Sequence, residues 1–343
     1  MADRAFVTGA TGFLGRSIVR DLIAAGRPVR ALARSEAAAQ RLAAIGAEPV
    51  RGDLLDRSAL EAGFEGCTTV YHAAGVNAFC LRDPRPLFEV NVAGSRTVVL
   101  AAGAAGVAKL VYTSSAATLD VASEGGAGGR RGSRRFLSNY ARSKYEAEQA
   151  VLEASASSGL AVVCVNPASV QGPGRTSGTA RLLIGYLNGR LPAAVDGPLN
   201  VIDIADCTRG HLLAEERGLP GERYLLCGAS MTLRSGLALL SRITGLNDSP
   251  RFLAPRLALA ASACIELVAA VRGKPTRFCR EMVRTLIEGS AYDGSKAAGD
   301  LGLVYTPIET TMRRTVSWYV EQGLITRPLP GFTEPSANPR GPA

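Results

Sequence analysis

The sequence predicts an α/β protein: a doubly wound parallel sheet followed by a smaller, mostly helical C-terminal lobe. Through the first half of the 343-residue chain, short β-branched runs alternate with longer segments of helical periodicity. This alternation is typical of repeated βαβ units. Several of the short runs are apolar throughout, as expected for strands that helices cover on both faces.

The elements follow in order along the chain. The expected strands are 4–8, 28–33, 47–51, 68–73, 109–114 and 160–167, and a later run at 222–227 is expected to return to the sheet. The clearest helical segments are 14–26 and 87–106, and further helices fill most of 231–322. We expect residues 1–166 to form the sheet domain, rejoined by 199–227, and residues 167–326 to form the lobe. The Pro- and Gly-rich tail, 327–343, is expected to be disordered.

Composition excludes few functions. Hydrophobic residues make up 47% of the chain and charged residues 20%, which is typical of a globular domain. The net charge of +9 would suit a nucleic-acid partner, but the basic residues are dispersed apart from 128–135. Phosphate-bearing small molecules explain the charge as well, so we expect no nucleic-acid partner.

The cysteine spacing and one apolar run indicate the cellular compartment and the relation of the chain to a membrane. The seven cysteines never stand in Cys-x-x-Cys spacing, and apolar residues flank most of them (positions 67, 80, 164, 207, 227, 264 and 279). They predict buried free thiols in the cytoplasm, with no disulfide framework and no metal site. The run at 257–271 carries Glu266 and is short for a membrane span, so we expect no stable membrane insertion. It predicts a buried or lobe helix, with attachment to a membrane surface as the alternative.

A glycine-rich turn follows the first expected strand, in the stretch TGATGFLG. Gly9, Gly12 and Gly15 are spaced three apart, which differs from the Gly-x-Gly-x-x-Gly pattern. Glycine permits a tight turn and lets the backbone approach a pyrophosphate at a helix N-terminus. A merely tight turn is the alternative. The position between a first strand and a first helix favours a dinucleotide-binding domain of the Rossmann type.

The residue at the end of the second expected strand bears on the choice of dinucleotide. An acidic residue there binds the ribose 2′-hydroxyl of NAD, whereas arginine accommodates the 2′-phosphate of NADP. The chain has Arg34 at this place, and Ser35 offers a further hydrogen bond. We therefore expect NADP(H) to be favoured over NAD(H). Glu36 complicates this inference, and an ordinary solvated Arg34 is the alternative.

A tyrosine and a lysine stand four residues apart in NYARSKYEAE, at an expected helix start. On a helix, Tyr140 and Lys144 share one face, and a lysine cation beside a phenol lowers the pKa of the phenol. Alone the pair is weak, because a helix that merely begins with polar residues gives the same pattern. His72 and His211 have no evident partners for metal or nucleophile chemistry, so we expect structural roles for both.

Taken together, these stretches resemble the extended short-chain dehydrogenase/reductase family, in the branch of dihydroflavonol-4-reductase-like enzymes, 3β-hydroxysteroid dehydrogenases and sugar epimerase/dehydratase-like proteins. The matching stretches are TGATGFLG, GDLLD (52–56), YHAAG (71–75), NVAGSRTVV (91–99), LVYTSSAAT (110–118), YARSK (140–144) and NPASVQGPG (166–174). The likeness extends to about residue 325, and none of these motifs identifies a substrate.

The resemblance implies a role for each matched residue. Tyr140 would be the general acid, Lys144 would lower its pKa and bind the nicotinamide ribose, and Ser115, rather than Ser114, would orient the reacting oxygen. The implied cofactor-binding residues are Gly9, Thr11, Gly12, Phe13, Leu14, Gly15, Arg34, Asp53, Leu54, Ala73, Ala74, Gly75, Tyr140, Lys144, Pro167, Ser169 and Val170. Asn91 either supports the cofactor site or simply starts a helix.

The resemblance leaves the substrate open. Asp120 falls where the dihydroflavonol-4-reductase branch places a residue that contacts substrate. The arginine-rich loop at 128–135 either recognises an anionic substrate or is simply solvated. The expected function is NADP(H)-dependent reduction of a ketone or aldehyde on a small-molecule substrate, by a homodimer. The alternatives are a nucleotide-sugar epimerase or dehydratase with tightly bound NAD, and a cofactor-sensing scaffold without catalysis.

Overall fold

The computed structural model describes residues 3–119, 136–276 and 278–332, and within them seven strands form one parallel sheet. The strand order is β10-β6-β5-β4-β1-β2-β3, so the chain winds outward from β1 in both directions. The strands are β1 (Ala5–Thr8), β2 (Val29–Ala33), β3 (Glu48–Arg51), β4 (Thr69–His72), β5 (Lys109–Thr113), β6 (Ala161–Pro167) and β10 (Arg223–Leu226). The predicted doubly wound sheet is confirmed.

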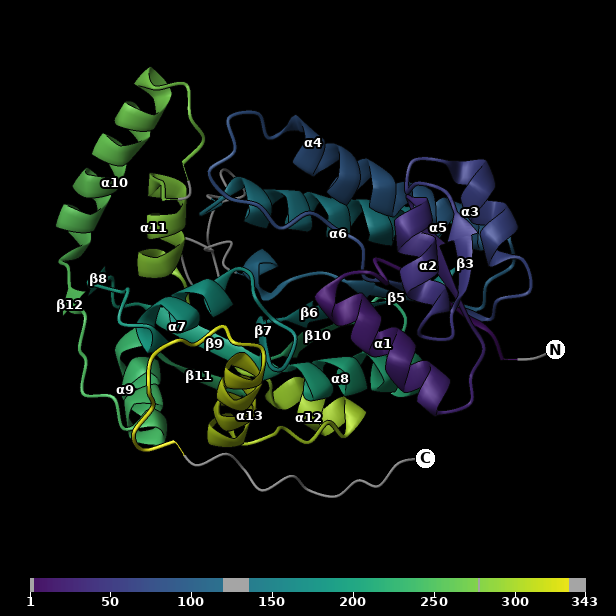
Figure 1. Cartoon of the computed structure of the whole chain (residues 1–343). Helices are drawn as coiled ribbons and strands as arrows, with labels where there is room; N and C mark the ends of the chain where they lie inside the picture. The colour runs from purple at the N-terminus through teal and green to yellow at the C-terminus, as the bar shows by residue number, and fades with distance from the viewer. Residues whose placement is uncertain (1–2, 120–135, 277, 333–343) are drawn as a thin grey trace.

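Helices cover both faces of this sheet (Figure 1). One face packs against α1 (Phe13–Ala24), α2 (Glu36–Ala43), α8 (Ile204–Arg217) and α12 (Ser295–Leu301). The other packs against α3 (Arg57–Phe64), α5 (Ser95–Ala104) and α6 (Asn139–Ser158). Successive strand residues point to opposite faces, so Val111 lies in the first of these cores and Leu110 and Tyr112 lie in the second.

The segment predicted as one helix over 87–106 is a helix with an irregular beginning. A short α4 (Arg85–Phe88) leads into a π-helical turn, η1 (Glu89–Gly94), and only then into α5. Such turns carry an extra residue and concentrate at functional sites. Asn91 lies inside this turn, so it is not a helix-start residue.

The C-terminal lobe is mostly helical, as predicted, and it also contains two small sheets. The first pairs β7 (Ser169–Gln171) and β11 (Ala229–Thr232) with β9 (Pro198–Asp203), and the second pairs β8 (Ala193–Ala194) with β12 (Arg251–Phe252). Its helices are α7 (Thr179–Leu187), α9 (Leu233–Thr244), α10 (Pro255–Val271), α11 (Arg280–Glu288) and α13 (Ile308–Glu321). β8 and β12 have two residues each, too few for a periodicity to be recognised in a sequence.

The apolar run at 257–271 forms most of α10, which lies at the outer edge of the lobe beside α11 (Figure 1). It is a lobe helix but not a buried one, because its only buried residues are Ala258 and Ser262. In the part of the chain that the structure describes, no helix combines the length and the apolar character needed to cross a bilayer.

The cysteine prediction is wrong in part. Cys80 and Cys279 form a disulfide across a separation of 199 residues, and Cys264 is exposed. The remaining cysteines (Cys67, Cys164, Cys207 and Cys227) are buried free thiols, as expected. Local spacing cannot reveal a pair that only the tertiary fold brings together. Among the described residues, no group of three or more His, Cys, Asp or Glu side chains could hold a metal ion.

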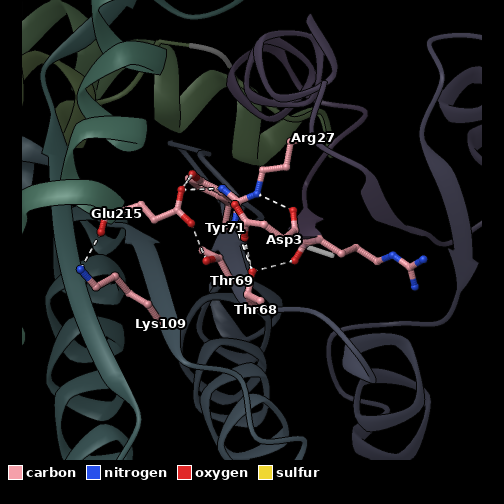
Figure 2. A network of polar contacts seen from close by, with 8 residues as sticks. Asp3, Arg27, Thr68, Thr69, Tyr71, Lys109 and Glu215 are labelled. Atoms are coloured by element: carbon pink, nitrogen blue, oxygen red, sulfur yellow. Dashed lines mark hydrogen bonds and ion pairs between the residues drawn. The ribbon is translucent and has the colours of Figure 1, made fainter. Parts of the chain in front are cut away.

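A polar network fixes α8 against the sheet (Figure 2). The Glu215 carboxylate accepts hydrogen bonds from Arg27 (2.7 Å), from Thr69 (2.5 Å) and from the Tyr71 hydroxyl. The Lys109 ammonium donates to the Glu215 backbone oxygen at 2.6 Å. The network therefore connects a helix from the second half of the chain to β4 and β5.

We expect Glu215→Gln to lower the free energy of unfolding by roughly 2 kcal/mol at pH 7, because it leaves partly buried donors without their charged acceptor. Burial raises the pKa of Glu215, but the hydrogen bonds from Arg27, Thr69 and Tyr71 outweigh it and hold the pKa below its ordinary value. A lowered carboxyl pKa stabilises the fold above the pKa of the unfolded chain, and this stabilisation is lost as the pH falls through the folded value. Urea denaturation at several pH values measures both effects.

Glu216→Gln is the matched control. Glu216 is exposed and pairs with exposed Arg217 at 3.4 Å, so its replacement should change stability by less than about 0.5 kcal/mol. Equal losses in the two variants, or a Glu215→Gln loss that persists in acid, would contradict the assigned role of this network.

Candidate active site

A cavity of about 370 Å³ opens where the loops after β1, β4, β5 and β6 meet. The carboxyl ends of parallel strands are where ligands bind in folds of this type. The cavity brings together many of the residues singled out from the sequence. Those that line it are Leu14, Ala73, Ala74, Gly75, Ser115, Tyr140, Lys144, Pro167, Ser169 and Val170.

The glycine turn lies directly behind this cavity, with Thr11 and Phe13 in the same segment. Gly9 has a φ of +70°, and a Cβ there would lie 2.6 Å from the Ala74 nitrogen. A Cβ on Gly15 would lie 2.3 Å from the Gly9 oxygen. Gly12 is the N-cap of α1 and has no side chain that could cap the first backbone N–H groups. These residues fit a pyrophosphate, which needs close backbone approach and open helix N–H groups.

Besides the residues of the glycine turn, three further residues matched for cofactor binding lie outside the lining of this cavity, after neighbouring strands. Arg34 is exposed directly after β2. Asp53 is exposed after β3 and accepts a hydrogen bond from the Leu55 nitrogen at 3.1 Å. Leu54 is buried, and the Cβ of Leu54 would lie 3.2 Å from a Cβ on Gly94.

Two other sequence-based inferences have different outcomes. Ser35 caps α2, because its Oγ accepts a hydrogen bond from the Ala38 nitrogen at 3.2 Å. The hydroxyl hydrogen of a serine remains free to donate in such a cap. Asp120 and the arginine-rich loop at 128–135 lie outside the described residues.

Tyr140 is held in the first turn of α6. The N-cap Ser138 accepts a hydrogen bond from the Ala141 nitrogen at 3.0 Å and so starts the helix just before Tyr140. The Tyr140 side chain and Ser115 both line the cavity, and the Ser115 hydroxyl acts to lower the pKa of the phenol. Ser114 also lines the cavity, but its hydroxyl has no hydrogen-bond partner among the described residues.

The pKa of Tyr140 is raised above its ordinary value, because burial outweighs the lowering effects of the Ser115 side chain and of the Arg175 charge. The expectation that Lys144 lowers this pKa is therefore wrong for the arrangement seen here. The physical reason is that the Lys144 ammonium is directed to other partners.

Lys144 is buried and donates to the Thr113 backbone oxygen at 2.8 Å and to the Tyr112 hydroxyl at 3.0 Å. Its Nζ also lies 4.6 Å from the centre of the Tyr112 ring. Burial lowers the pKa of Lys144 to about 8, although the neighbouring Glu148 carboxylate favours the charged form. A lysine in this state exchanges a proton near neutral pH.

Glu148 follows Lys144 by one helical turn and is fully buried. Its carboxylate pairs with Arg223 of β10 at 2.7 Å and accepts a hydrogen bond from Asn166 of β6 at 2.8 Å. Asn166 also donates to the Ser115 backbone oxygen, at 3.3 Å. These contacts, which the motifs did not indicate, connect the backbone of Ser115 to Glu148 of α6 through Asn166.

Asn91 supports the wall of the cavity. Its side chain accepts a hydrogen bond from the Val76 nitrogen at 2.7 Å and donates to the Val76 oxygen at 3.0 Å. It also donates to the Ser143 hydroxyl at 2.9 Å. Of the two interpretations that the sequence left open, the structure favours a supporting residue, because Asn91 fixes the loop after β4 to α6.

The motifs missed several parts of the cavity lining, among them one loop and one helix. Arg175 lines it from the loop after β7, and its guanidinium lies 5.4 Å from the centre of the Phe13 ring. Thr285, Leu286 and Gly289, in α11 and just after it, form the opposite wall. The sequence marked the first region only as a Gly/Pro loop, and nothing in the second distinguished it from other helical segments.

Both histidines are buried and hydrogen-bonded. His72 lies between Thr8 (2.7 Å) and Ser95 (2.9 Å), and burial lowers its pKa to about 3. His211 contacts the Cys207 oxygen and Thr113, and burial lowers its pKa to about 4. Both side chains are therefore neutral at physiological pH, which agrees with the predicted structural roles.

The doubly wound sheet, the glycine cradle and the cavity at the carboxyl ends of the strands define a Rossmann-fold protein that binds a dinucleotide. Comparison with known proteins gives the family. The model of the NAD dependent epimerase/dehydratase family matches residues 5–227. The chain belongs to this family, and it is an NAD(P)-dependent oxidoreductase of the extended short-chain dehydrogenase/reductase type.

Two relatives of similar length are reductases by name. A Synechocystis sp. protein, provisionally named a dihydroflavonol 4-reductase, is 35% identical over 95% of this chain and 97% of its own. A 4-hydroxy-2-methyl-3-oxo-4-farnesyl-3,4-dihydroquinoline-1-oxide ketoreductase of Stigmatella aurantiaca is 36% identical, covering 71% of this chain and 74% of its own. The crystal structure of gox2253 matches with a TM-score of 0.80 at 30% identity, over 94% of this chain and 100% of that one.

The ammonium of Lys144 should titrate near pH 8, well below the ordinary lysine value of 10.5. Between these two values the unfolded chain binds the proton more tightly, so the contribution of Lys144 to stability rises with pH. The chain has only four lysines, Lys109, Lys144, Lys274 and Lys296, so NMR of protein labelled at lysine Cε resolves them singly.

Lys144→Met assigns the Lys144 resonance by its loss. The same variant should remove part of the gain in unfolding free energy between pH 8 and pH 10.5. A Lys144 resonance that titrates near 10.5 would show that the ammonium is solvated, which the contacts with Tyr112 and Thr113 do not allow.

Proposed function

We propose that the chain reduces a ketone or aldehyde on a small molecule to the alcohol, with NADP(H) as the preferred cofactor. The observation that carries this proposal is that Ser115, Tyr140 and Lys144 line one cavity, with Tyr140 and Lys144 one turn apart on α6. The names of the reductase relatives support the same reaction class.

The protein's own groups supply the proton and the positioning. Hydride delivery to the carbonyl carbon is the chemistry that a bound reduced nicotinamide supplies. A carbonyl oxygen placed between the Tyr140 and Ser115 hydroxyls accepts a hydrogen bond from each, and Tyr140 transfers its proton as the alkoxide develops. Lys144 holds a positive charge beside this position and, with its pKa near 8, exchanges protons with its surroundings.

The raised pKa of Tyr140 leaves the phenol protonated, which is the form that can give a proton to a carbonyl oxygen. A phenol that keeps its proton at neutral pH is ready to act as an acid, whereas oxidation of an alcohol requires the phenolate as a base. The exposed Arg34 after β2 supports a preference for the additional phosphate of NADP(H).

Tyr140→Phe should lower kcat roughly 100- to 10,000-fold, because it removes the proton donor but leaves the ring in place. Binding of the dinucleotide should be retained. Steady-state turnover of a carbonyl library and fluorescence titration with NADPH measure the two properties separately.

Tyr145→Phe is the control, since Tyr145 lies on the same helix and does not line the cavity. It should keep turnover within about twofold of the parent protein. Full activity in Tyr140→Phe would overturn the mechanism, and loss of both binding and turnover would place Tyr140 in cofactor binding instead.

Arg34→Ala should weaken NADPH binding by roughly tenfold or more and leave NADH binding nearly unchanged, because only NADPH carries the 2′-phosphate. Arg41→Ala, at an exposed arginine in the last turn of α2, should change neither. Equal losses for both cofactors, or for neither, would contradict the proposed preference.

The alternative is an epimerase or dehydratase with tightly bound NAD. The description of the family supports it, as does Glu36 in the first turn of α2, next to Arg34. Denaturing the purified protein and identifying the released nicotinamide by mass spectrometry separates the two. Stoichiometric NAD favours the alternative, whereas little retained cofactor and tighter binding of NADPH favour the reductase.

A further inference from the structure

The outer face of α10 is apolar along its length. Leu257, Ala261, Cys264, Val268 and Val271 follow one another at intervals of four, three, four and three residues, which places them along one side of the helix. All of them are exposed, and Leu267 and Ile265 flank the row. Val271 is 80% exposed and Leu267 is 66% exposed. A surface helix normally presents its polar side to water, and α10 presents its apolar side.

We propose that this apolar face of α10 docks on an anionic lipid surface, with the helix lying in the plane of the membrane interface. The helix does not need to cross the bilayer for this. Helices that lie in the membrane interface have one apolar side and a basic polar side, and they can be shorter than a membrane-spanning helix.

The inner side of α10 shows that the orientation is fixed by the fold. Ala258 and Ser262 are its buried residues. Glu266 is the one acidic residue of the helix, and it pairs with Arg280 of α11 through a side-chain contact of 2.6 Å and a backbone hydrogen bond of 2.9 Å. The negative charge of Glu266, which would oppose contact with an anionic lipid surface, is therefore directed to α11 and paired with Arg280.

Basic side chains flank the apolar face at both ends of the helix. Arg256 lies in its first turn, and Arg272 and Lys274 follow its last turn. All three are exposed. Each basic residue near an anionic lipid surface strengthens binding about fivefold, and the whole chain, with a net charge of +9, is drawn in the same direction.

The same charges argue against a second copy of the chain as the occupant. A symmetric dimer through α10 is isologous, so antiparallel helices would bring Arg256 of one copy towards Arg272 and Lys274 of the other. Like charges at both ends oppose that contact, whereas anionic headgroups complement them.

The docking face is one helix away from the cavity. α10 packs on α11, and Thr285 and Leu286 of α11 line the cavity. A lipid-docked α10 would hold this wall close to the membrane, where apolar small molecules concentrate. The docking itself does not depend on the proposed reduction.

Flotation of the full chain with vesicles tests the proposal. We expect binding to vesicles of phosphatidylcholine with 30% phosphatidylglycerol, much weaker binding to phosphatidylcholine alone, and loss of binding in high salt. The double variant Leu267→Ser/Val271→Ser should weaken partitioning roughly tenfold or more, because it removes exposed apolar groups from the docking face. Arg272→Gln/Lys274→Gln should weaken binding to anionic vesicles about fivefold for each charge.

The matched control is Leu219→Ser/Val304→Ser, which removes apolar groups that are 63% and 83% exposed elsewhere on the surface. It should bind vesicles like the parent protein. Equal effects of the two serine pairs, or no binding to anionic vesicles, would overturn the proposal. So would a dimer, measured by light scattering, that dissociates in Leu267→Ser/Val271→Ser, because the occupant would then be a second copy.

Discussion

The close approach of two backbone segments at Gly9 sets the geometry of the whole site. With a φ of +70° and no room for a Cβ, the chain after β1 lies directly against Ala73 and Ala74, which follow β4. The same turn places Gly15 against the Gly9 oxygen and so starts α1 beside the sheet. Any side chain at these positions would separate the strands' ends, and the cavity that opens there would lose its wall.

A second constraint comes from buried charge. Lys144 and Glu148 are buried and opposite in charge, and both depend on partners from other elements, because a buried charge without a partner is costly. Glu148 pairs with the partly exposed Arg223. Arg223 belongs to β10, which lies next to β6 in the sheet but follows part of the lobe in the sequence. The electrostatic environment of α6 is therefore completed by residues far from it in sequence.

These two constraints explain which features could be predicted. The strands, the glycine turn and the pairing of Tyr140 with Lys144 on one helix face depend on local periodicity and spacing, and the sequence shows both. Arg175, the Glu148 network and the Cys80–Cys279 disulfide depend on contacts between distant segments, which no local pattern encodes. The pKa of Tyr140 was predicted in the wrong direction for the same reason, since burial and the partners of Lys144 are tertiary properties.

The helix α11 shows how the lobe takes part in the site. The Glu281 carboxylate accepts hydrogen bonds from the Asn139 nitrogen (2.5 Å), next to Tyr140, and from the Cys80 nitrogen (2.9 Å). Cys279, the N-cap of α11, is bonded to Cys80 as well. One end of α11 is thus fixed to the segments that position Tyr140, its far end lines the cavity, and its outer side carries α10. α10 is therefore connected to the segment of Tyr140 through a single helix, α11.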